Sequence, residues 1–299
     1  MKLVQYGKLG REKPGLIDNN GDIRDLSSKI TRIDANVLSK NNLEKLKKIN
    51  INSLKKVRGK PRLGVPISGI RKIVCIGLNY ADHAKETNSP IPMEPIIFMK
   101  PTSSLNGPYD DVVLPRGILI GKKAANRKSP YTDSKRSDWE VELGIVIGET
   151  ARSVSESKSM QHVAGFTIVN DVSERAYQLD AAGKQWIRGK GCDTFCPVGP
   201  WLVTRDEVKK PQNLNIWLEL NGKKVQDGNT KTMIFGVKTL VSYVSHFMSL
   251  EPGDVIATGT PPGVGMGMKP AKYLKPGDEM RVGIEGLGEQ FQKVVKWKR

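Results

Sequence analysis

The two glutamates of the segment DWEVELG (138–144) have the spacing of a metal-binding pair. On a β-strand, residues i and i+2 project from the same face, so Glu140 and Glu142 would lie side by side on a mostly apolar strand. Two ionised carboxylates that close repel each other and resist burial, and a hard divalent cation that shares their oxygens removes the conflict. The spacing is equally compatible with a solvated pair on the outer face of a strand whose apolar residues form the core.

A third carboxylate, Asp171, ends the apolar run GFTIVND (165–171). At a strand end it can supply a further oxygen ligand, and three carboxylates leave about half of a magnesium octahedron open for water and substrate. The alternative role is that of a helix N-cap, because the sequence SERAYQL follows at 173–179. The sequence alone leaves both roles open.

His83 and Glu86 form a second candidate pair within GLNYADHAKE (77–86). Because they are three positions apart in a predicted helical turn, they would lie on one face of it. A carboxylate bonded to an imidazole fixes the tautomer and raises the basicity of the ring, as a general base requires. An exposed His–Glu pair without a catalytic role is the alternative. The other two histidines, at positions 162 and 246, have no such partner close in sequence.

Two glycine-rich segments could shape the rest of a small-molecule site. In IRGKG (187–191), the glycines on either side of Lys190 would let the backbone bend closely around a ligand and aim one ammonium at it. In ATGTPPGVG (257–265), which contains Thr260, a rigid turn would present Thr hydroxyls and amides to a carboxylate. This second segment lacks the Gly-Lys-Ser/Thr ending of a phosphate-binding loop, which argues against nucleotide binding.

The formal net charge of +17 on 299 residues is unevenly distributed. Residues 1–66 contain 16 Lys and Arg against 6 Asp and Glu, and residues 116–137 contain 7 against 1. A non-enzymatic basic protein that binds nucleic acid is one interpretation of this pattern. The basic residues are not interleaved with aromatic ones, however, and no nucleic-acid-binding module is recognisable. A lysine-rich solvated surface therefore explains the charge better, and nucleic acid is not an expected partner.

The composition also bears on the compartment. Apolar residues come in short runs, and none approaches the roughly 18 residues of a membrane-spanning helix. The first residues lack the apolar segment of a signal peptide, so a cytoplasmic protein is expected, with no membrane partner. The three cysteines, at positions 75, 192 and 196, show no paired pattern and are expected to be structural thiols in a reducing compartment.

The elements that must position these residues are predominantly strands. The sequence predicts a hairpin around Asn-Asn-Gly-Asp (19–22) within a small N-terminal α+β domain, residues 1–66, that ends in a Pro/Gly-rich linker. Residues 67–299 form the predicted catalytic domain, in which strand-length runs dominate and an amphipathic helix is expected at 237–249. Since no alternating βα rhythm is present, we predict a β-rich α+β fold, a mixed β-roll or barrel.

Seven segments in family order resemble the fumarylacetoacetate hydrolase superfamily over residues 72–267, about two thirds of the chain. They are GLNYADHAKE, PIIFMKPTSSLNGP, SDWEVELGIVIG, GFTIVNDVSERAYQ, QWIRGKGCDTFCPVGPWLV, GNTKTMIF and LEPGDVIATGTPPGVG. The resemblance implies a mixed β-roll catalytic domain, a smaller N-terminal domain and a homodimer. The long QWIRGKGCDTFCPVGPWLV segment is most similar to members described as ureidoglycolate lyase or 2-hydroxyhepta-2,4-diene-1,7-dioate isomerase.

By this resemblance, each subunit binds one Mg²⁺ or Mn²⁺ and carries three groups of site residues. The groups are metal ligands (Glu140, Glu142, Asp171), catalytic residues (His83 and Glu86 as a dyad on a lid, and Lys190) and substrate contacts (Arg175, Gln178, Thr260). The implied activity is hydrolysis of a C–C bond in a small anionic 2-oxo or 1,3-dioxo acid, of the acylpyruvate or fumarylpyruvate type, through a metal-stabilised enolate. The same machinery would serve a ureidoglycolate lyase or a dienedioate isomerase or decarboxylase.

One segment departs from the family pattern. About seventeen residues, at about 118–134, separate DDVVLPRG (110–117) from the strand that carries Glu140. This insert is basic and enters the chain just before the predicted metal ligands. We hypothesise that it steers anionic substrates towards the site.

Overall fold

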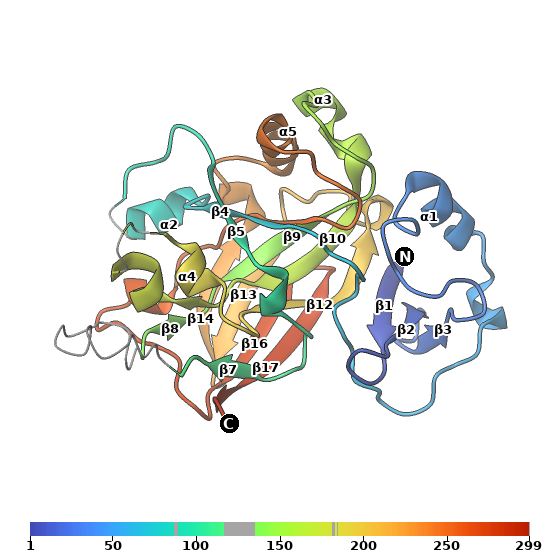
Figure 1. Ribbon diagram of the computed structural model, residues 1–299, viewed down its shortest axis with the longest axis horizontal. Helices are drawn as coiled ribbons and strands as arrows, with labels where there is room; N and C mark the ends of the chain where they lie inside the picture. Colours follow the sequence, from blue (N-terminus) through green and yellow to red (C-terminus); the bar gives the residue numbers. More distant parts are fainter. Residues whose placement is uncertain (87–88, 117–134, 181–182, 184, 299) are drawn as a thin grey trace, which may run out of the picture.

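The computed structural model describes residues 1–86, 89–116, 135–180, 183 and 185–298. The basic insert expected at about 118–134 lies outside the described residues. Within them, most strands belong to two sheets that stack on each other (Figure 1). No helix in the described ranges is long and apolar enough to cross a membrane.

The larger sheet has ten strands, and it is mixed, with antiparallel pairs predominating. Its order is β3 (Ile23–Asp25), β2 (Lys13–Ile17), β1 (Lys2–Tyr6), β12 (Cys196–Thr204), β10 (Val163–Asn170), β9 (Val141–Ile147), β15 (Val255–Ala257), β4 (Ile73–Gly77) and β5 (Ile96–Lys100), and the short β6 (Leu105–Asn106) pairs with β12. The path ends at two different strands, so the sheet is open.

The second sheet has five strands and is also open. Its order is β14 (Lys223–Asn229), β13 (Asn215–Leu220), β16 (Glu279–Ile284), β17 (Gly288–Lys296) and β7 (Val112–Leu114). A two-stranded pair, β8 (Ser137–Asp138) and β11 (Ser173–Glu174), lies beside the ends of β9 and β10. The architecture is thus a strand-rich α+β roll, which confirms the predicted fold class, and its sheets do not close into a barrel.

Helices are short and lie around the sheets (Figure 1). The α-helices are α1 (Lys40–Lys47), α2 (Ala81–Glu86), α3 (Glu156–Ser159), α4 (Ile187–Lys190) and α5 (Val237–Phe247). The single turns are η1 (Ile51–Ser53), η2 (Thr102–Ser104), η3 (Met160–His162), η6 (Arg205–Glu207), η7 (Thr230–Thr232), η8 (Gly265–Gly267) and the π-helical η4 (Ala176–Asp180). The amphipathic helix predicted at 237–249 is confirmed as α5, whose buried residues recur at helical spacing.

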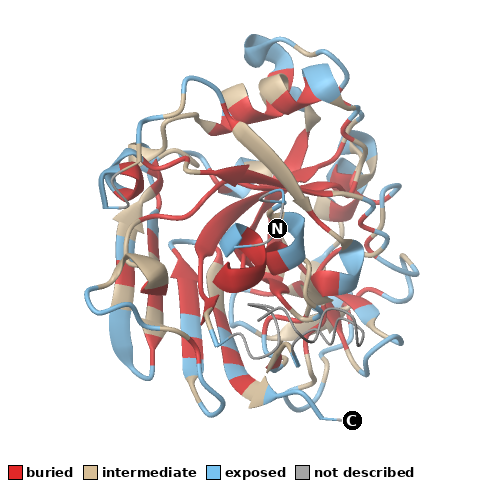
Figure 2. Cartoon of the chain, turned by 60° about the vertical axis from the view of Figure 1, so that its left-hand side comes forward, coloured by how far each residue is buried: buried red, intermediate tan, exposed pale blue. Residues whose placement is uncertain are grey.

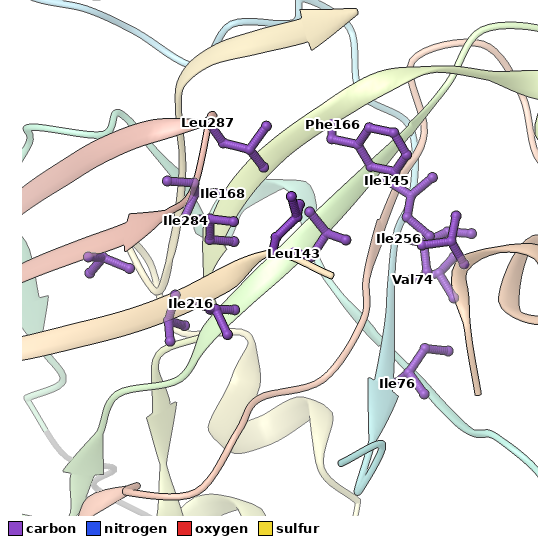
Figure 3. Close-up of a cluster of buried hydrophobic side chains, with 14 of the residues drawn as sticks. Val74, Ile76, Leu143, Ile145, Phe166, Ile168, Ile216, Ile256, Ile284 and Leu287 are labelled. Carbon is purple, nitrogen blue, oxygen red and sulfur yellow. The ribbon is translucent and has the colours of Figure 1, made fainter. Parts of the chain in front are cut away.

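The strands β9 and β10 run through the centre of the molecule. Their side chains alternate between two faces, and each face borders a different hydrophobic core. On β9, Leu143 and Ile145 face the core between the two sheets, which also receives Ile216 and Ile284 of the smaller sheet (Figure 3). Val146 points the other way, into a second core that the N-terminal segment covers. Figure 2 shows the central strands as almost wholly buried, whereas outer strands alternate between buried and exposed residues. Because side chains alternate along a strand, Glu142 lies on the face opposite Leu143.

The N-terminal segment extends the large sheet. The hairpin predicted around residues 19–22 is confirmed as the antiparallel pair β2–β3, and β1 pairs with both β2 and β12. In Figure 1 this segment forms the blue group at the right, with α1 above its strands. A domain boundary at residue 66 remains a prediction.

The central position of β9 leads to a prediction about stability. Leu143 is completely buried, so Leu143→Ala leaves a cavity between the sheets and should lower the free energy of unfolding by roughly 2–5 kcal/mol. Urea unfolding followed by tryptophan fluorescence measures the change. Leu9→Ala is the matched control, because that leucine is 79% exposed and its loss should change stability by no more than about 0.5 kcal/mol. A loss below about 1 kcal/mol for Leu143→Ala would contradict the assigned core.

Candidate active site

Three buried carboxylates meet where β9 begins and β10 ends. Glu140 immediately precedes β9, Glu142 lies on it, and Asp171 immediately follows β10. The antiparallel register pairs Val141 with Asn170, and the Asp171 amide donates a hydrogen bond to the Glu140 carbonyl at 2.8 Å. One carboxylate oxygen of each side chain lies within 4.8 Å of the others, which is compatible with three ligands of one metal ion.

Each carboxylate has one oxygen held by a donor of the protein. The contacts are Arg175 Nη1 to Glu140 Oε1 (2.7 Å), Lys100 Nζ to Asp171 Oδ1 (2.6 Å) and the Gly259 amide to Glu142 Oε2 (2.8 Å). Lys190 Nζ contacts the other oxygens of two of them, Glu140 Oε2 and Asp171 Oδ2, at 2.7 Å each. The cluster is therefore held in place from several sides.

The charges of the cluster are unequally compensated. Burial raises the pKa of Glu140, but Lys190 and Arg175 outweigh it and lower the pKa to about 2. No cation of the described residues forms an ion pair with Glu142: burial, followed by the charges of Asp171 and Glu140, outweighs the charge of Lys190 and raises its pKa well above the usual range. A divalent cation supplies the positive charge that Glu142 lacks, and hard oxygen ligands suit Mg²⁺ or Mn²⁺. The residues present thus fit such an ion.

The histidine–glutamate pair is also formed. His83 and Glu86 lie on one face of α2, and His83 Nδ1 is 2.9 Å from Glu86 Oε2. A carboxylate only accepts hydrogen bonds, so Nδ1 carries the proton and Nε2 is the basic nitrogen. The second oxygen of Glu86 accepts a bond from the Gly263 amide at 2.9 Å, which ties α2 to the segment 257–265.

One cavity of about 210 Å³ connects these groups. Of the nine site residues predicted from the sequence, seven line it: His83, Glu140, Glu142, Arg175, Gln178, Lys190 and Thr260. Glu86 contacts the cavity through His83, and Asp171 is completely buried behind it. Aromatic side chains of Phe98 and Trp186 form an apolar wall.

All three predicted substrate contacts form hydrogen bonds within the protein. Thr260 Oγ1 donates to the Val141 carbonyl at 2.9 Å and accepts from Gln226 at 2.8 Å. Arg175 donates to Gln178 Oε1 at 3.0 Å, so the amide NH₂ of Gln178 remains a donor for a substrate oxygen.

The glycines of both segments allow close contacts within the protein. A side chain at Gly189 would come within 2.4 Å of the Glu174 carbonyl oxygen, so this glycine lets α4 pack on the backbone of residues 174–178 and deliver Lys190 to the cluster. Gly259 has a φ of +93°, and its amide donates a hydrogen bond to a carboxylate of the protein, that of Glu142.

Two residues of the site were not predicted from the sequence. Lys100 is buried at the end of β5 and contacts Asp171. Asp138 is completely buried, binds Arg175 Nε at 2.9 Å, and accepts the amides of Gly265 and Met266 at 2.7 and 3.0 Å. The sequence contained a signal for both residues, a charge at the end of an apolar run. Lys100 ends the run IIFMK, and Asp138 begins the run DWEVEL. Such a residue needs a buried partner.

Comparisons with known proteins agree with this fold and site. A family model described as Fumarylacetoacetate (FAA) hydrolase C-terminal matches residues 72–295. A 2,4-didehydro-3-deoxy-L-rhamnonate hydrolase of Sphingomonas sp. (strain SKA58) is 54% identical over 299 residues, which are 100% of this chain and 97% of the relative.

Two solved structures are similar over the whole chain. A fumarylacetoacetate hydrolase from Exiguobacterium antarcticum has a TM-score of 0.84 and 34% identity, covering 99% of this chain and 100% of that one. Maleylpyruvate hydrolase from Sphingobium sp. SYK-6, in complex with manganese(II) ion and pyruvate, has a TM-score of 0.79 and 28% identity, with 100% of both chains covered. Together with the family match, these similarities establish that the chain is an enzyme, a hydrolase that belongs to the fumarylacetoacetate hydrolase family.

Proposed function

We propose that the chain is a divalent-metal-dependent hydrolase that cleaves a C–C bond in a small 2,4-dioxo acid of the acylpyruvate type. The observation that carries this proposal is that Glu140, Glu142, the Lys190 ammonium and the His83 imidazole all line one cavity, with Asp171 buried directly behind it. Its volume of about 210 Å³ suits a small acid.

In this proposal, Glu140, Glu142 and Asp171 hold one Mg²⁺ or Mn²⁺ per subunit. When bound there, the ion supplies Lewis-acid stabilisation of the negative charge that develops on substrate oxygens. The uncompensated burial of Glu142 supports this assignment, and so does the manganese complex of the Sphingobium relative.

His83, Glu86 and Lys190 have different roles in the proposed hydrolysis. His83, oriented by Glu86, takes a proton from water, and the water oxygen bonds to the C4 carbonyl carbon. The C3–C4 bond breaks, and its electron pair becomes an enolate over C3, C2 and the C2 oxygen, which Lys190 stabilises electrostatically. His83 returns the proton to C3. One water is consumed, and the products are pyruvate and a carboxylic acid.

The Sphingomonas relative indicates a specific first substrate. We propose 2,4-didehydro-3-deoxy-L-rhamnonate, a 2,4-dioxo acid, because that relative is 54% identical over the whole chain. Cleavage between C3 and C4 would give pyruvate and lactate. We further propose a cytoplasmic homodimer, supported by three free cysteine thiols and by the family resemblance.

The substrate proposal is tested with a panel of acids and added Mg²⁺ or Mn²⁺. We expect stoichiometric pyruvate, measured with lactate dehydrogenase, from 2,4-didehydro-3-deoxy-L-rhamnonate and acetylpyruvate, with rates that EDTA abolishes and Mn²⁺ restores. Oxaloacetate and ureidoglycolate are the comparison substrates. Turnover of either one at a higher kcat/KM than both dioxo acids would overturn the proposed substrate class.

The proposed role of the dyad predicts a loss in the chemical step. His83→Asn removes the basic nitrogen and should lower kcat roughly 10²–10⁴-fold with acetylpyruvate, while KM changes little. His246→Asn is the control, because this histidine lies exposed on α5 and should be replaceable without effect. If His83→Asn retains a third of the wild-type kcat, the general base lies elsewhere.

The proposed metal site predicts a linked gain in stability. At a Mn²⁺ concentration of about 100 times Kd, the wild-type free energy of unfolding should rise by about 2.7 kcal/mol. Glu142→Gln should fold, because glutamine resembles the protonated side chain that the raised pKa favours, but it should gain little from Mn²⁺. Glu285→Gln, exposed in the turn that follows β16, should gain as the wild type does. Equal gains in all three proteins would exclude Glu142 as a ligand.

A further inference from the structure

Two buried lysines contact opposite oxygens of the same carboxylate. Lys100 Nζ lies 2.6 Å from Asp171 Oδ1, and Lys190 Nζ lies 2.7 Å from Asp171 Oδ2. Their side chains are 0% and 2% exposed, so neither is a solvated surface group. The two lysines have different surroundings, which indicate different roles.

Lys100 is fixed in the body of the protein. It ends β5, which pairs with β4 inside the large sheet, and its ammonium also donates to the Val172 carbonyl at 3.1 Å. Both acceptors belong to the turn that follows β10. Lys100 therefore determines how the Asp171 carboxylate is oriented, and it leaves Oδ2 for another partner.

Lys190 occupies the side of the cluster that faces the cavity. Its ammonium bridges Glu140 Oε2 and Asp171 Oδ2, while the other oxygens of these two residues are held by Arg175 and Lys100. The two oxygens bridged by Lys190 are thus the ones that remain for a metal. Lys190 lines the cavity, whereas Lys100 does not border it.

An ammonium and a divalent cation compete for these oxygens. Divalent ions of the magnesium type bind carboxylate oxygens at about 2.1 Å, and a positive charge already 2.7 Å from the same atoms would be strongly repelled. The Phe98 ring centroid already lies 5.1 Å from Nζ, so the ring face can keep contact with the ammonium when it moves off the carboxylates into the cavity.

We infer that in the metal-free site the Lys190 ammonium occupies the carboxylate oxygens that the metal would bind, and that metal binding displaces it from Glu140 and Asp171 into the cavity, where it meets the substrate. Lys100 is a positioning residue that stays on Asp171 in both states. This inference rests on the proposed metal site. It predicts that the metal binds before the substrate, because Lys190 becomes available to an anionic substrate only after the metal has bound.

The two lysines should affect metal affinity in opposite directions. Lys190→Met removes the competitor, and the Kd for Mn²⁺, measured by calorimetry or by electron paramagnetic resonance, should fall about tenfold. Lys100→Met releases the carboxylate that it orients, and the Kd should rise by roughly 10–100-fold. Lys223→Met, on an exposed edge strand, is the control for loss of one positive charge and should leave the Kd unchanged. An unchanged or higher Kd for Lys190→Met overturns the inference, as does a lower Kd for Lys100→Met.

A second measurement uses the wild-type chain, in case Lys190→Met fails to fold. Brief acetylation with acetic anhydride, read by peptide mass spectrometry, should modify Lys190 several-fold faster with saturating Mn²⁺ than without it, and Lys100 should remain unreactive in both cases. Equal acetylation of Lys190 with and without Mn²⁺ overturns the inference. If wild-type protein binds no Mn²⁺ at all, the proposed function fails instead, so the two failures can be distinguished.

Discussion

The burial of three carboxylates against one another is the constraint on which the rest of the structure depends. One carboxylate oxygen each of Glu140, Glu142 and Asp171 lies within 4.8 Å of the others, because β9 and β10 pair side by side in the sheet. Like charges at this distance, removed from water, oppose folding unless cations compensate them. The fold supplies Arg175, Lys100 and Lys190, but none of the cations in the described part of the chain forms an ion pair with Glu142. The same imbalance that opposes folding underlies the proposed affinity for a divalent ion.

The acids lie on rigid elements, and the groups that would act on a substrate lie on more adaptable ones. The acids stand at the ends of central strands, where two cores fix the backbone on both faces. The groups that would act on a substrate, His83 and Lys190, stand instead on the short helices α2 and α4. A helix of one or two turns has little stability of its own, so its position depends on a few contacts, such as that of Glu86 with the Gly263 amide.

Asp138 shows how one buried residue couples several parts of the site. It fixes the Arg175 guanidinium, which contacts Glu140, and it also holds the amides of the turn at 265–266. Asp138 therefore anchors the Glu140 carboxylate, through Arg175, together with a wall of the cavity and the loop that contacts α2. Such outer contacts determine the geometry that the residues facing the cavity can adopt.

Local sequence determined the elements and much of the site. The i, i+2 spacing of Glu140 and Glu142, the i, i+3 spacing of His83 and Glu86, the hairpin and α5 are all read from neighbouring residues, because strand and helix periodicity fix which side chains share a face. The choice for Glu142 between a solvated face and a buried cluster was decided only by the tertiary structure, since both faces of β9 are covered. Lys100 and Asp138 were missed for the same reason. Their partners are distant in sequence, and only the pairing of strands brings a buried charge to the charge that compensates it.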